Sequence, residues 1–510
     1  MVGRLDDERN IRIEKAVLLR ERGINPYPRR YDITSFIGPY CDTFGPRLTE
    51  ASATLEDRVQ LAGRLMAKRQ HGKLSFGQLE DQSGSVQIVV ANETVGYENY
   101  RLFCELIDRG DIVGVKGTPM RTKSGQLSVR VQTVDLLTKT IRPLPTKWFG
   151  VKDEVAVYHD RSLFLTMNPE AREILIRRSR GIRTMRDHFD RLGFMEVEIP
   201  TLQPIYGGAT ARPFKTHVHA LDADLYLSIS PELYLKRIVA GGFFNGVYTI
   251  CKNFRNEGID RTHNPEFTMM EVYRAFWDYE DMMRLTENVF AEIFEQVRGT
   301  TKVKYPALIE GKLTELELDF TPPWRRATML DLVYEHTGID ANSMDKESLV
   351  AAMRERYKHG ELGADGEFYS ENTWGGLVQS LFGTFVESNL IQPTIVINHP
   401  VESTPLCKGH PGDRRLIERF EPFAAGMELG NAYSEENDPV RQRELLEEQA
   451  ARGRAGDPEA HRMDKEFLSA IDLGIPPTGG LGIGIDRMAM LLTGARSIRD
   501  VVYFSLSRKK

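Results

Sequence analysis

Cysteine is scarce in this sequence. Its 510 residues include only four cysteines, Cys41, Cys104, Cys251 and Cys407, and no two of them form a C-x-x-C pair. Disulfide frameworks and cysteine-rich zinc sites both use cysteines at short, regular spacings. The wide spacing here excludes both.

Long apolar runs are also missing. No stretch approaches the roughly 18 consecutive apolar residues that a membrane span requires. Residues 1–23 are charged throughout and contain no apolar core of the kind found in secretory signal peptides. We therefore expect no membrane partner and a cytoplasmic location.

The motifs of covalent catalysis are absent as well. The sequence has no G-x-S-x-G elbow, no H-E-x-x-H pattern and no cysteine in a recognisable nucleophile context. Its conspicuous segments instead combine arginine, glutamate and glycine, which can handle phosphate groups by electrostatics. The composition, 41% hydrophobic and 27% charged, is typical of a folded globular protein.

The length and the charge distribution suggest more than one domain. A chain of 510 residues is too long for one hydrophobic core of usual size. Residues 1–150 contain 23 Lys+Arg against 18 Asp+Glu, a net charge of +5, whereas the remainder carries −11. A basic N-terminal part on an acidic body is compatible with a nucleic-acid partner.

Short alternating segments in the N-terminal part predict a small β domain. Five strands are expected, with a helix near residues 100–107 between the third and the fourth, which is the layout of an OB-fold barrel. Any other small β domain would satisfy the same pattern. A proline-rich linker at Ile141–Pro145 places the domain boundary between residues 146 and 147. The expected strands are residues 59–61, 74–79, 85–89, 112–115 and 127–131.

The C-terminal part alternates helices and strands. Apolar residues at helical spacing predict a helix over residues 169–192, which Gly193 ends. A strand over Phe194–Ile199 follows and stops at Pro200. Residues 327–390 are expected to be rich in helix.

Two glutamates in one segment predict a cation site. Phe420–Leu429 is expected to form a hairpin with its turn at Ala424–Ala425, which places Glu421 opposite Glu428. Like charges facing each other across strands are destabilising, and a bound cation would reverse that effect. Carboxylate oxygens suit Mg²⁺. An exposed pair splayed into water is the alternative.

A second segment combines an arginine, a histidine and an aromatic ring. Residues 248–257 and 265–273 predict two strands joined by a polar loop. His263 and Phe267, with an arginine, could hold phosphates and a purine there. Surface charges and a core phenylalanine are the alternative. Two charged residues are expected to share one face of the first strand: Arg255 and Glu257.

Two helix starts also carry charged residues. Gly479–Gly484 predicts a glycine-rich strand that leads into a helix near Asp486, which places Arg487 at the positive helix end, close to a potential anion. Tight packing of strand and helix is the alternative. Ser230 and Pro231 are expected as the cap and first residue of another helix, with Glu232 in its first turn.

Together these segments resemble the class II aminoacyl-tRNA synthetases, in the subgroup with an N-terminal OB-fold. Residues 193–200 are similar to motif 1, residues 254–271 to motif 2 and residues 482–487 to motif 3. The resemblance runs from about residue 58 to the C-terminus. It implies an α+β fold: a helical lead-in and OB-fold anticodon-binding barrel at residues 1–146, and a catalytic domain at residues 147–510 built on an antiparallel sheet flanked by helices.

Within the subgroup, the sequence is most similar to the lysine-specific members. Ser230–Arg237 resembles their amino-acid-site helix, and aspartate- and asparagine-specific members have glutamine at the Glu232 position. A substrate that ends in an ammonium requires carboxylates, which Glu232 and Glu435 could supply. The alternative is that Glu232 binds no ligand and only complements the helix dipole.

The resemblance implies an activity and a set of partners. ATP would activate lysine to lysyl-adenylate with release of pyrophosphate, and the lysyl group would pass to the 3′ end of tRNA(Lys). Mg²⁺ would be required, and a homodimer would form through motif 1. A paralogue that lysylates a protein, or a non-catalytic RNA-binding relative, are alternatives. The first kind lacks the barrel, and the second would be expected to have lost an arginine or a metal carboxylate.

The resemblance also implies roles for individual residues. Arg255 and Arg487 would be catalytic and, with Glu257, His263, Asn264 and Phe267, would bind ATP. Glu421 and Glu428 would bind the metal. The lysine pocket would comprise Gly208, Glu232, Glu271, Tyr273, Asn431, Tyr433 and Glu435, and the anticodon would contact Arg64, Phe76 and Gln87.

Overall fold

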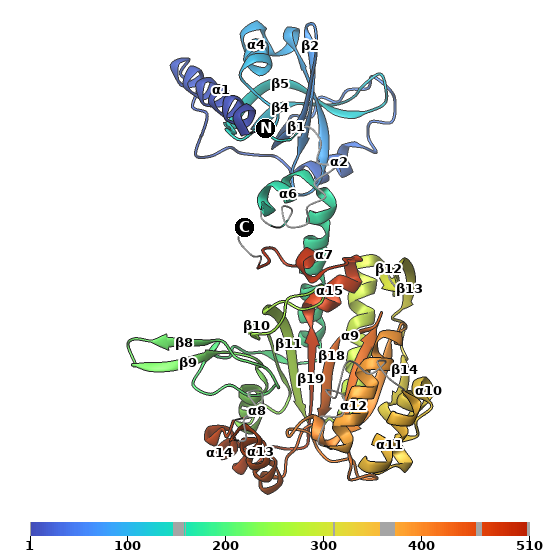
Figure 1. The fold of residues 1–510 in the computed structure, drawn as a ribbon. Helices are drawn as coiled ribbons and strands as arrows, with labels where there is room; N and C mark the ends of the chain where they lie inside the picture. Colours follow the sequence, from blue (N-terminus) through green and yellow to red (C-terminus); the bar gives the residue numbers. More distant parts are fainter. Residues whose placement is uncertain are drawn as a thin grey trace. The chain divides into compact units, whose positions relative to one another are not determined.

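The chain divides into two compact units, Met1–Asp153 and Glu154–Lys510. The computed structural model describes residues 2–145, 158, 160–309, 312–357, 373–454 and 462–506 (Figure 1). The boundary expected between residues 146 and 147 lies outside the described residues. Each unit is described by itself below.

The first unit is a closed β-barrel with strand order β1-β2-β3-β5-β4. Two helices lie between β3 and β4, so the predicted OB-fold layout is confirmed. Its strands are β1 (Val59–His71), β2 (Leu74–Glu80), β3 (Ser85–Ala91), β4 (Ile112–Arg121) and β5 (Leu127–Thr138). Its helices are α1 (Val2–Glu21), α2 (Ile37–Phe44), α3 (Asn92–Val95) and α4 (Tyr97–Glu105).

The second unit is built on a nine-stranded sheet. The six strands from β15 to β10 run antiparallel to one another, whereas β14 and β6 at the two edges run parallel to their neighbours. The expected antiparallel sheet is therefore confirmed in the interior and wrong at the edges. The order is β14 (Arg325–Thr328), β15 (Thr394–Pro400), β16 (Leu416–Ala424), β18 (Gly430–Ser434), β19 (Thr478–Gly484), β11 (Glu266–Ala275), β10 (Val247–Phe254) and β6 (Met195–Glu196), with β17 (Met427–Glu428) paired to β16.

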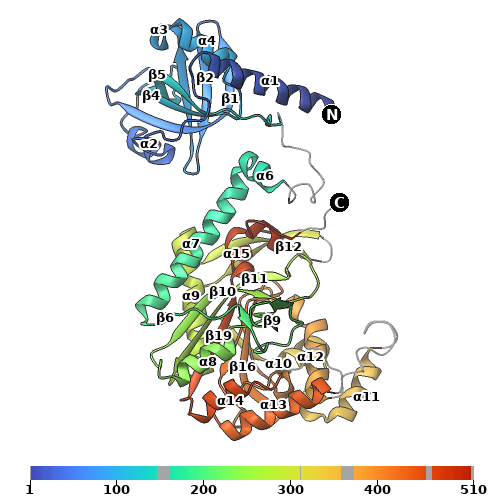
Figure 2. The same ribbon diagram turned by 90° about the vertical axis from the view of Figure 1, so that its left-hand side faces the viewer.

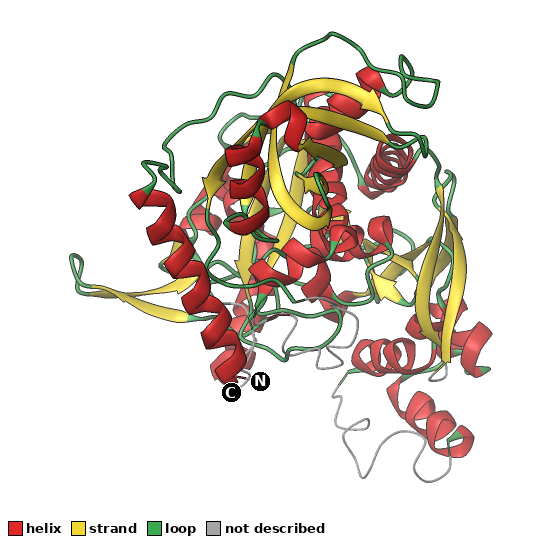
Figure 3. Ribbon diagram, turned by 90° about the horizontal axis from the view of Figure 1, so that it is seen from above, coloured by secondary structure: helices red, strands yellow, loops and turns green. Residues whose placement is uncertain are grey.

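Two small sheets and a set of helices complete the second unit; Figure 3 colours helices red and strands yellow. The small sheets are β12 (Lys302–Ile309) with β13 (Lys312–Asp319), and β7 (Leu202–Gln203), β9 (Ala223–Leu227) and β8 (Lys215–Val218). The helices are α6 (Arg161–Met167), α7 (Pro169–Arg191), α8 (Glu232–Ala240), α9 (Tyr279–Arg298), α10 (Met329–Thr337), α11 (Lys346–Arg356), α12 (Trp374–Phe385), α13 (Pro439–Arg454), α14 (Lys465–Asp472), α15 (Ile485–Thr493) and α16 (Ile498–Val501). Short 3₁₀ turns are η1 (Ala341–Ser343), η3 (Glu387–Asn389) and η4 (Val401–Ser403).

Helix α7 forms where the sequence predicts it. The Asn168 side chain accepts a hydrogen bond from the backbone N–H of Ala171, Pro169 is the first helical residue, and Gly193 follows the helix with φ +81°. The strand expected over Phe194–Ile199 is shorter, because only Met195–Glu196 pairs with β10.

The strands of the sheet separate a core face from a site face. Met270 and Val272 on β11 pack into one core with α7, α9 and α15, and Figure 2 shows α7 alongside α9. Successive side chains on a strand point to opposite faces, so Glu271 and Tyr273 point away from that core. The chemistry predicted from this strand therefore lies on the opposite face of the sheet.

Glycines keep the site face open on β19. A side chain at Gly480 would overlap the Glu435 carboxylate and the Tyr273 ring. Leu481 and Ile483, which alternate with the glycines, belong to the core face. The glycine run therefore leaves space for buried charged side chains; it does not form a phosphate-binding loop.

Among the described residues, no helix is both long and apolar enough to span a membrane.

Candidate active site

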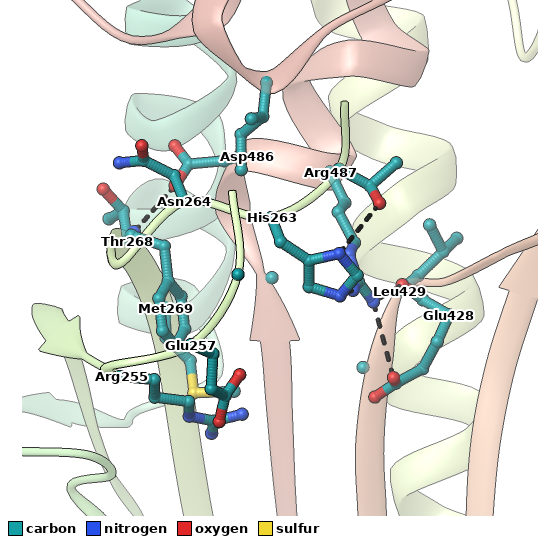
Figure 4. Close-up of a pocket in the computed structure, with 16 residues that line it drawn as sticks. Arg255, Glu257, His263, Asn264, Thr268, Met269, Glu428, Leu429, Asp486 and Arg487 are labelled. Atoms are coloured by element: carbon teal, nitrogen blue, oxygen red, sulfur yellow. Dashed lines mark hydrogen bonds and ion pairs between the residues drawn. The ribbon is translucent and has the colours of Figure 1, made fainter. Parts of the chain in front are cut away.

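A pocket lies between the loop that joins β10 to β11, the hairpin of β16 and β17, and the start of α15. In Figure 4, Arg255 and Glu257 lie on one side of this pocket, and Arg487 and Glu428 on the other. All six residues predicted to bind ATP line it, together with the metal candidate Glu428. We call it the arginine pocket; it is lined by Arg255, Glu257, Gly258, Thr262, His263, Asn264, Phe267, Thr268, Met269, Glu428, Leu429, Gly430, Gly484, Asp486, Arg487 and Ile498.

Arg255 lies just beyond the end of β10. Strand β10 ends at Phe254, so the prediction that Arg255 and Glu257 share a strand face is wrong. The Arg255 guanidinium carbon lies 5.1 Å from the centroid of the Phe267 ring, and its Nε donates to the carbonyl of Ile229 at 3.4 Å. Burial lowers the pKa of Arg255, although nearby glutamates oppose that effect. A half-buried guanidinium that faces a pocket is suited to bind an anion.

Arg487 lies in the first turn of α15, close to the predicted place. Its Nη1 donates to the Glu428 carbonyl at 2.7 Å and lies 3.4 Å from the Glu428 carboxylate. Its Nη2 lies 3.0 Å from Nε2 of His263, whose Nδ1 lies 2.8 Å from the Asp260 carboxylate. These contacts hold the guanidinium at the pocket, where the helix N-terminus adds positive potential.

A buried ion pair behind the pocket fixes both of its walls. Arg178 on α7 donates to the Asp486 carboxylate at 2.8 Å and to the Thr268 hydroxyl at 2.9 Å. The other Asp486 oxygen accepts the backbone N–H of Thr268 at 2.7 Å. Asp486 precedes Arg487, and Thr268 follows Phe267, so this network positions two side chains that line the pocket. Arg178 was not predicted, because its partner Asp486 lies far away in the sequence.

We expect Arg178→Met to destabilise the second unit by about 3–5 kcal/mol, because it leaves the Asp486 carboxylate buried without its partner. Urea unfolding followed by fluorescence measures the loss. Arg177→Met is the matched control: Arg177 forms a partly exposed pair with Glu173 on the same helix, and such pairs contribute about 0–1 kcal/mol. Equal losses in the two variants would contradict a structural role for the buried pair.

A second cavity adjoins the arginine pocket. Arg255, Met269 and Glu428 line both, so the two spaces are neighbours. We call it the carboxylate cavity; it is lined by Gly208, Ala209, Thr210, Ser230, Glu232, Arg255, Met269, Glu271, Tyr273, Gln379, Ser403, Thr404, Arg419, Glu421, Glu428, Asn431, Tyr433, Gly480, Leu481 and Gly482. All residues predicted for a lysine pocket line it, except Glu435.

Glu271 is fully buried in the wall of the carboxylate cavity. Its carboxylate accepts hydrogen bonds from the Ser230 hydroxyl and the Tyr273 hydroxyl, each at 2.9 Å. Burial raises the pKa of Glu271 to about 8, and the nearby Glu232 contributes in the same direction. A carboxyl group in this state gains from a cationic ligand placed beside it.

Glu435, also predicted for the lysine pocket, is not among the residues that line the cavity, but its carboxylate lies directly beside Gly480, which does line it. It is 1% exposed and forms an ion pair with Lys236. Lys236 Nζ also donates to Oε1 of Glu232 at 2.7 Å, and the Tyr433 hydroxyl donates to the same oxygen. The i, i+4 spacing of Glu232 and Lys236 on α8 could have predicted the first contact. The long-range pair with Glu435 has no local signal.

The helix start at Glu232 also differs slightly from the prediction. Helix α8 begins at Glu232 with Pro231 as its cap, one residue later than expected. The Ser230 hydroxyl still accepts the backbone N–H of Glu232 at 3.2 Å. Glu232 therefore remains in the first turn of the helix, as predicted, and faces the cavity.

The hairpin that carries the metal candidates has a shifted register. Its turn residues are Ala425 and Gly426, with φ of 52° and 69°, and Glu428 pairs with Phe423 rather than with Glu421. Two-residue hairpin turns favour such left-handed residues. Phe423, the cross-strand partner of Glu428, is two residues from Glu421 along β16. Side chains two residues apart on a strand share a face, so Glu421 lies on the same face of the strand as Phe423.

The two carboxylates still influence each other. Burial raises the pKa of Glu428, and the charge of Glu421 raises it further. Arg419 donates to both Glu421 and Asn431, a bridge that was not predicted from the sequence. Two carboxylates beside a pocket that contains two arginines fit Mg²⁺, which commonly completes its shell with substrate phosphates and water. Among the described residues, no group of three or more potential ligands forms a metal cage.

The barrel of the first unit carries a separate groove. Phe76 and Gln87 line it, as predicted for base contacts, whereas Arg64 does not: its Nη1 donates to the carbonyl of Gly110 at 2.8 Å. The Gln87 side-chain carbonyl accepts the Ser128 hydroxyl at 2.8 Å, which turns its amide N–H₂ toward other partners. The full lining is Arg69, His71, Leu74, Phe76, Gln87, Val89, Met120, Thr122, Lys123 and Ser124.

Comparisons with known proteins agree with this geometry. Residues 153–508 match the family described as tRNA synthetases class II (D, K and N), and residues 59–137 match the OB-fold nucleic acid binding domain. A lysine–tRNA ligase of Syntrophomonas wolfei is 44% identical over 509 residues, covering 99% of this chain and 98% of the relative. One of Bacillus subtilis is 44% identical over 510 residues, with the same coverage, and one of Methanoculleus marisnigri is 46% identical over 493 residues, covering 97% and 93%.

Proposed function

Because the chain belongs to the class II tRNA synthetases of the aspartate, lysine and asparagine group, we propose that it is a lysine–tRNA ligase. The observation that carries this proposal is the carboxylate cavity, which joins buried Glu232 and Glu271 to the arginine pocket through Arg255. A side chain ending in an ammonium suits this cavity, whereas an aspartate side chain would be repelled by it. The relatives with this name support the same assignment.

The geometry supports a two-step reaction. In the first step, a carboxylate oxygen of lysine attacks the α-phosphorus of ATP, a new P–O bond forms, and the bond to pyrophosphate breaks. Arg255 lies where the two cavities meet, so it can bind the lysine carboxylate and the α-phosphate together. In the second step, a ribose hydroxyl at the 3′ end of tRNA attacks the acyl carbonyl, loses its proton, and AMP leaves. Positioning and charge stabilisation supply the catalysis.

The nucleotide would occupy the arginine pocket. Phe267 offers a flat face to adenine, Arg487 and His263 offer donors to the phosphates, and Glu257 and Asn264 lie at the rim. Glu421 and Glu428 would hold Mg²⁺, which when bound neutralises phosphate charge. Glu421 is already balanced by Arg419, and Glu428 by Arg487, so these carboxylates are pre-positioned by arginines.

Charging of tRNA tests the proposal directly. The purified protein with ATP and Mg²⁺ should attach labelled lysine to a tRNA(Lys) transcript and should leave a tRNA(Asp) transcript uncharged. Charging of tRNA(Asp) with aspartate instead would reject lysine specificity while leaving the class intact.

The barrel groove would bind anticodon bases. We expect Phe76→Ala to raise the KM for tRNA(Lys) by about 10- to 100-fold, since stacking of a base on an aromatic ring contributes roughly 1–3 kcal/mol. Lysine-dependent ATP–pyrophosphate exchange, which needs no tRNA, should be unchanged. Phe36→Ala is the matched control, because Phe36 is 61% exposed on the same unit and lies outside the groove. An unchanged KM for Phe76→Ala would contradict the groove assignment.

A homodimer is also proposed, through the region of motif 1. Exposed apolar side chains lie on the short edge strand β6, just before it, just before its neighbour β10, and just after β11, and the rings of Phe244 and Phe276 contact each other with centroids 6.1 Å apart. Large exposed apolar patches are typical of protein interfaces. The residues are Leu192, Met195, Phe243, Phe244 and Phe276.

Light scattering tests this interface. The wild type should have twice the chain mass, and Met195→Asp with Phe276→Asp should yield a monomer, because two charges cannot be buried without partners. Tyr334→Asp, at an exposed site on α10, should remain a dimer. A wild type that is monomeric at micromolar concentration would contradict the proposal.

A further inference from the structure

The histidine of the arginine pocket has a partner at each of its two ring nitrogens. Nε2 of His263 lies 3.0 Å from Nη2 of Arg487 (Figure 4), and Nδ1 lies 2.8 Å from Oδ2 of Asp260. A guanidinium can only donate, so Nε2 must accept from it. The single proton of the neutral ring is therefore on Nδ1, from which it is donated to Asp260.

We propose that Asp260 is a positioning residue that gives His263 two successive roles. In the free protein it keeps Nε2 unprotonated, so that His263 accepts from Arg487 and holds the guanidinium at the pocket. When a nucleotide binds, Arg487 turns to a phosphate. His263 then takes up a proton from solvent on Nε2 and donates to a phosphate as an imidazolium, whose charge Asp260 offsets. This inference rests on the proposed binding of ATP in the arginine pocket.

The second oxygen of Asp260 fixes the orientation of its carboxylate. Oδ1 accepts the backbone N–H groups of Thr262 and His263 at 2.7 and 2.8 Å, and the Thr262 hydroxyl at 3.2 Å. That hydroxyl also lies 3.2 Å from Nδ1 of His263, where it can accept. Burial raises the pKa of Asp260, but the hydrogen bonds from Thr262 and His263 outweigh it and hold the pKa below its usual range. Asp260 is therefore ionised at neutral pH and presents Oδ2 to the ring.

Charged groups of both signs share the pocket with His263. Two arginines and three carboxylates line it, and one of these carboxylates, that of Asp486, is already paired with Arg178. On the loop of His263 itself, Arg261 donates to the carbonyl of Arg496. A bound triphosphate adds negative charge beside the ring, which favours its protonated form. The charged residues that line the pocket are Arg255, Glu257, Glu428, Asp486 and Arg487.

Asp260→Asn should disturb both roles of His263 without a change of shape. The three donors at Oδ1 keep the amide carbonyl in that position, so the amide N–H₂ faces Nδ1 and donates to it. The neutral ring must then carry its proton on Nε2, against the Arg487 guanidinium, and asparagine has no charge to offset an imidazolium. The Asp260 and His263 side chains are 59% and 51% exposed, so we expect the variant to fold normally.

Lysine-dependent ATP–pyrophosphate exchange is the first test. Asp260→Asn should raise the ATP KM by about 3- to 10-fold, the usual difference between a charged and a neutral hydrogen bond, and should leave the lysine KM nearly unchanged. In a His263→Gln background the same substitution should add nothing, because the ring through which it acts is gone. Asp224→Asn is the matched control. Asp224 forms an exposed pair with His217 at 3.0 Å, lies outside both cavities, and should behave as wild type when substituted.

Calorimetry with ATP and Mg²⁺, in the absence of lysine, is the second test. Titration at pH 8 in buffers of different ionisation enthalpy counts the protons taken up on binding. Histidine is ordinarily neutral at that pH, so the wild type should take up close to one proton more than His263→Gln. Asp260→Asn should match His263→Gln. A wild type that fails to bind ATP would reject the proposed function separately.

Four results would overturn the inference. The first is an ATP KM in Asp260→Asn within about twofold of wild type, and the second is an equal rise of the lysine KM. The third is an Asp260→Asn effect of the same size in the His263→Gln background. The fourth is equal proton uptake by the wild type and His263→Gln.

Discussion

Arg255→Ala should lower kcat for lysine-dependent ATP–pyrophosphate exchange by about 10²–10³-fold, because loss of one preorganised charge at the reacting group costs roughly 3–4 kcal/mol. Arg255 is the only described side chain with a guanidinium in the walls of both the arginine pocket and the carboxylate cavity. Its loss should therefore affect the step in which the two substrates react. Steady-state kinetics with varied ATP and varied lysine measures the effect.

Two further variants make this result interpretable. Arg255→Lys should recover only part of the activity, since an ammonium keeps the charge but cannot bind two oxygens in the planar, bidentate manner of a guanidinium. Arg284→Ala, in a partly exposed pair with Asp281 on α9, should retain full activity. If Arg255→Ala kept more than a third of the wild-type kcat, the assigned role of Arg255 would be wrong.

The second large effect concerns pH. In the free protein the pKa of Glu271 is about 8, raised first by burial and then by Glu232. A bound lysine ammonium favours the ionised carboxylate and lowers that pKa, so binding below pH 8 must release the proton. The affinity for lysine should accordingly fall by up to about tenfold for each pH unit between 8 and 6, and should be largely independent of this group above 8.

Calorimetry provides the measurement for this linkage. At pH 6.5, titration of the protein with lysine in buffers of different ionisation enthalpy should show release of close to one proton per lysine. Glu271→Gln should bind lysine much more weakly, and its remaining affinity should lose this pH dependence. Lysine affinity that stays constant from pH 6 to pH 8 in the wild type would refute the linkage.

The sequence predicted the elements with strong local signals. Alternation along residues 267–273 predicted which side chains of β11 share a face, and the structure places Glu271 and Tyr273 together on the site face as expected. The helix at residues 169–192 had a proline at its start and a glycine after its end, and its bounds agree within one residue. The five strands of the barrel followed turn residues in the same way.

The sequence failed to predict features that depend on contacts between distant segments or on the placement of a turn to within one residue. At the hairpin of β16 and β17, the turn lies one residue later than predicted, at Ala425 and Gly426, and this shift changes every cross-strand pair. The register is determined by the backbone conformation of the turn. Glu435 was predicted to face the substrate because an ammonium requires carboxylates, and its ion pair with Lys236, which lies far away in the sequence, was not foreseen. The Arg178–Asp486 pair was missed for the same reason, since it joins α7 to α15.

The central claim is that the carboxylate cavity selects lysine and that the arginine pocket activates it with ATP. Amino-acid-dependent ATP–pyrophosphate exchange, measured without tRNA for each of the twenty amino acids, tests both parts at once. The account predicts exchange with lysine alone. Exchange with a different amino acid would contradict the assignment of the cavity, and no exchange with any of them would contradict the proposed enzymatic activity.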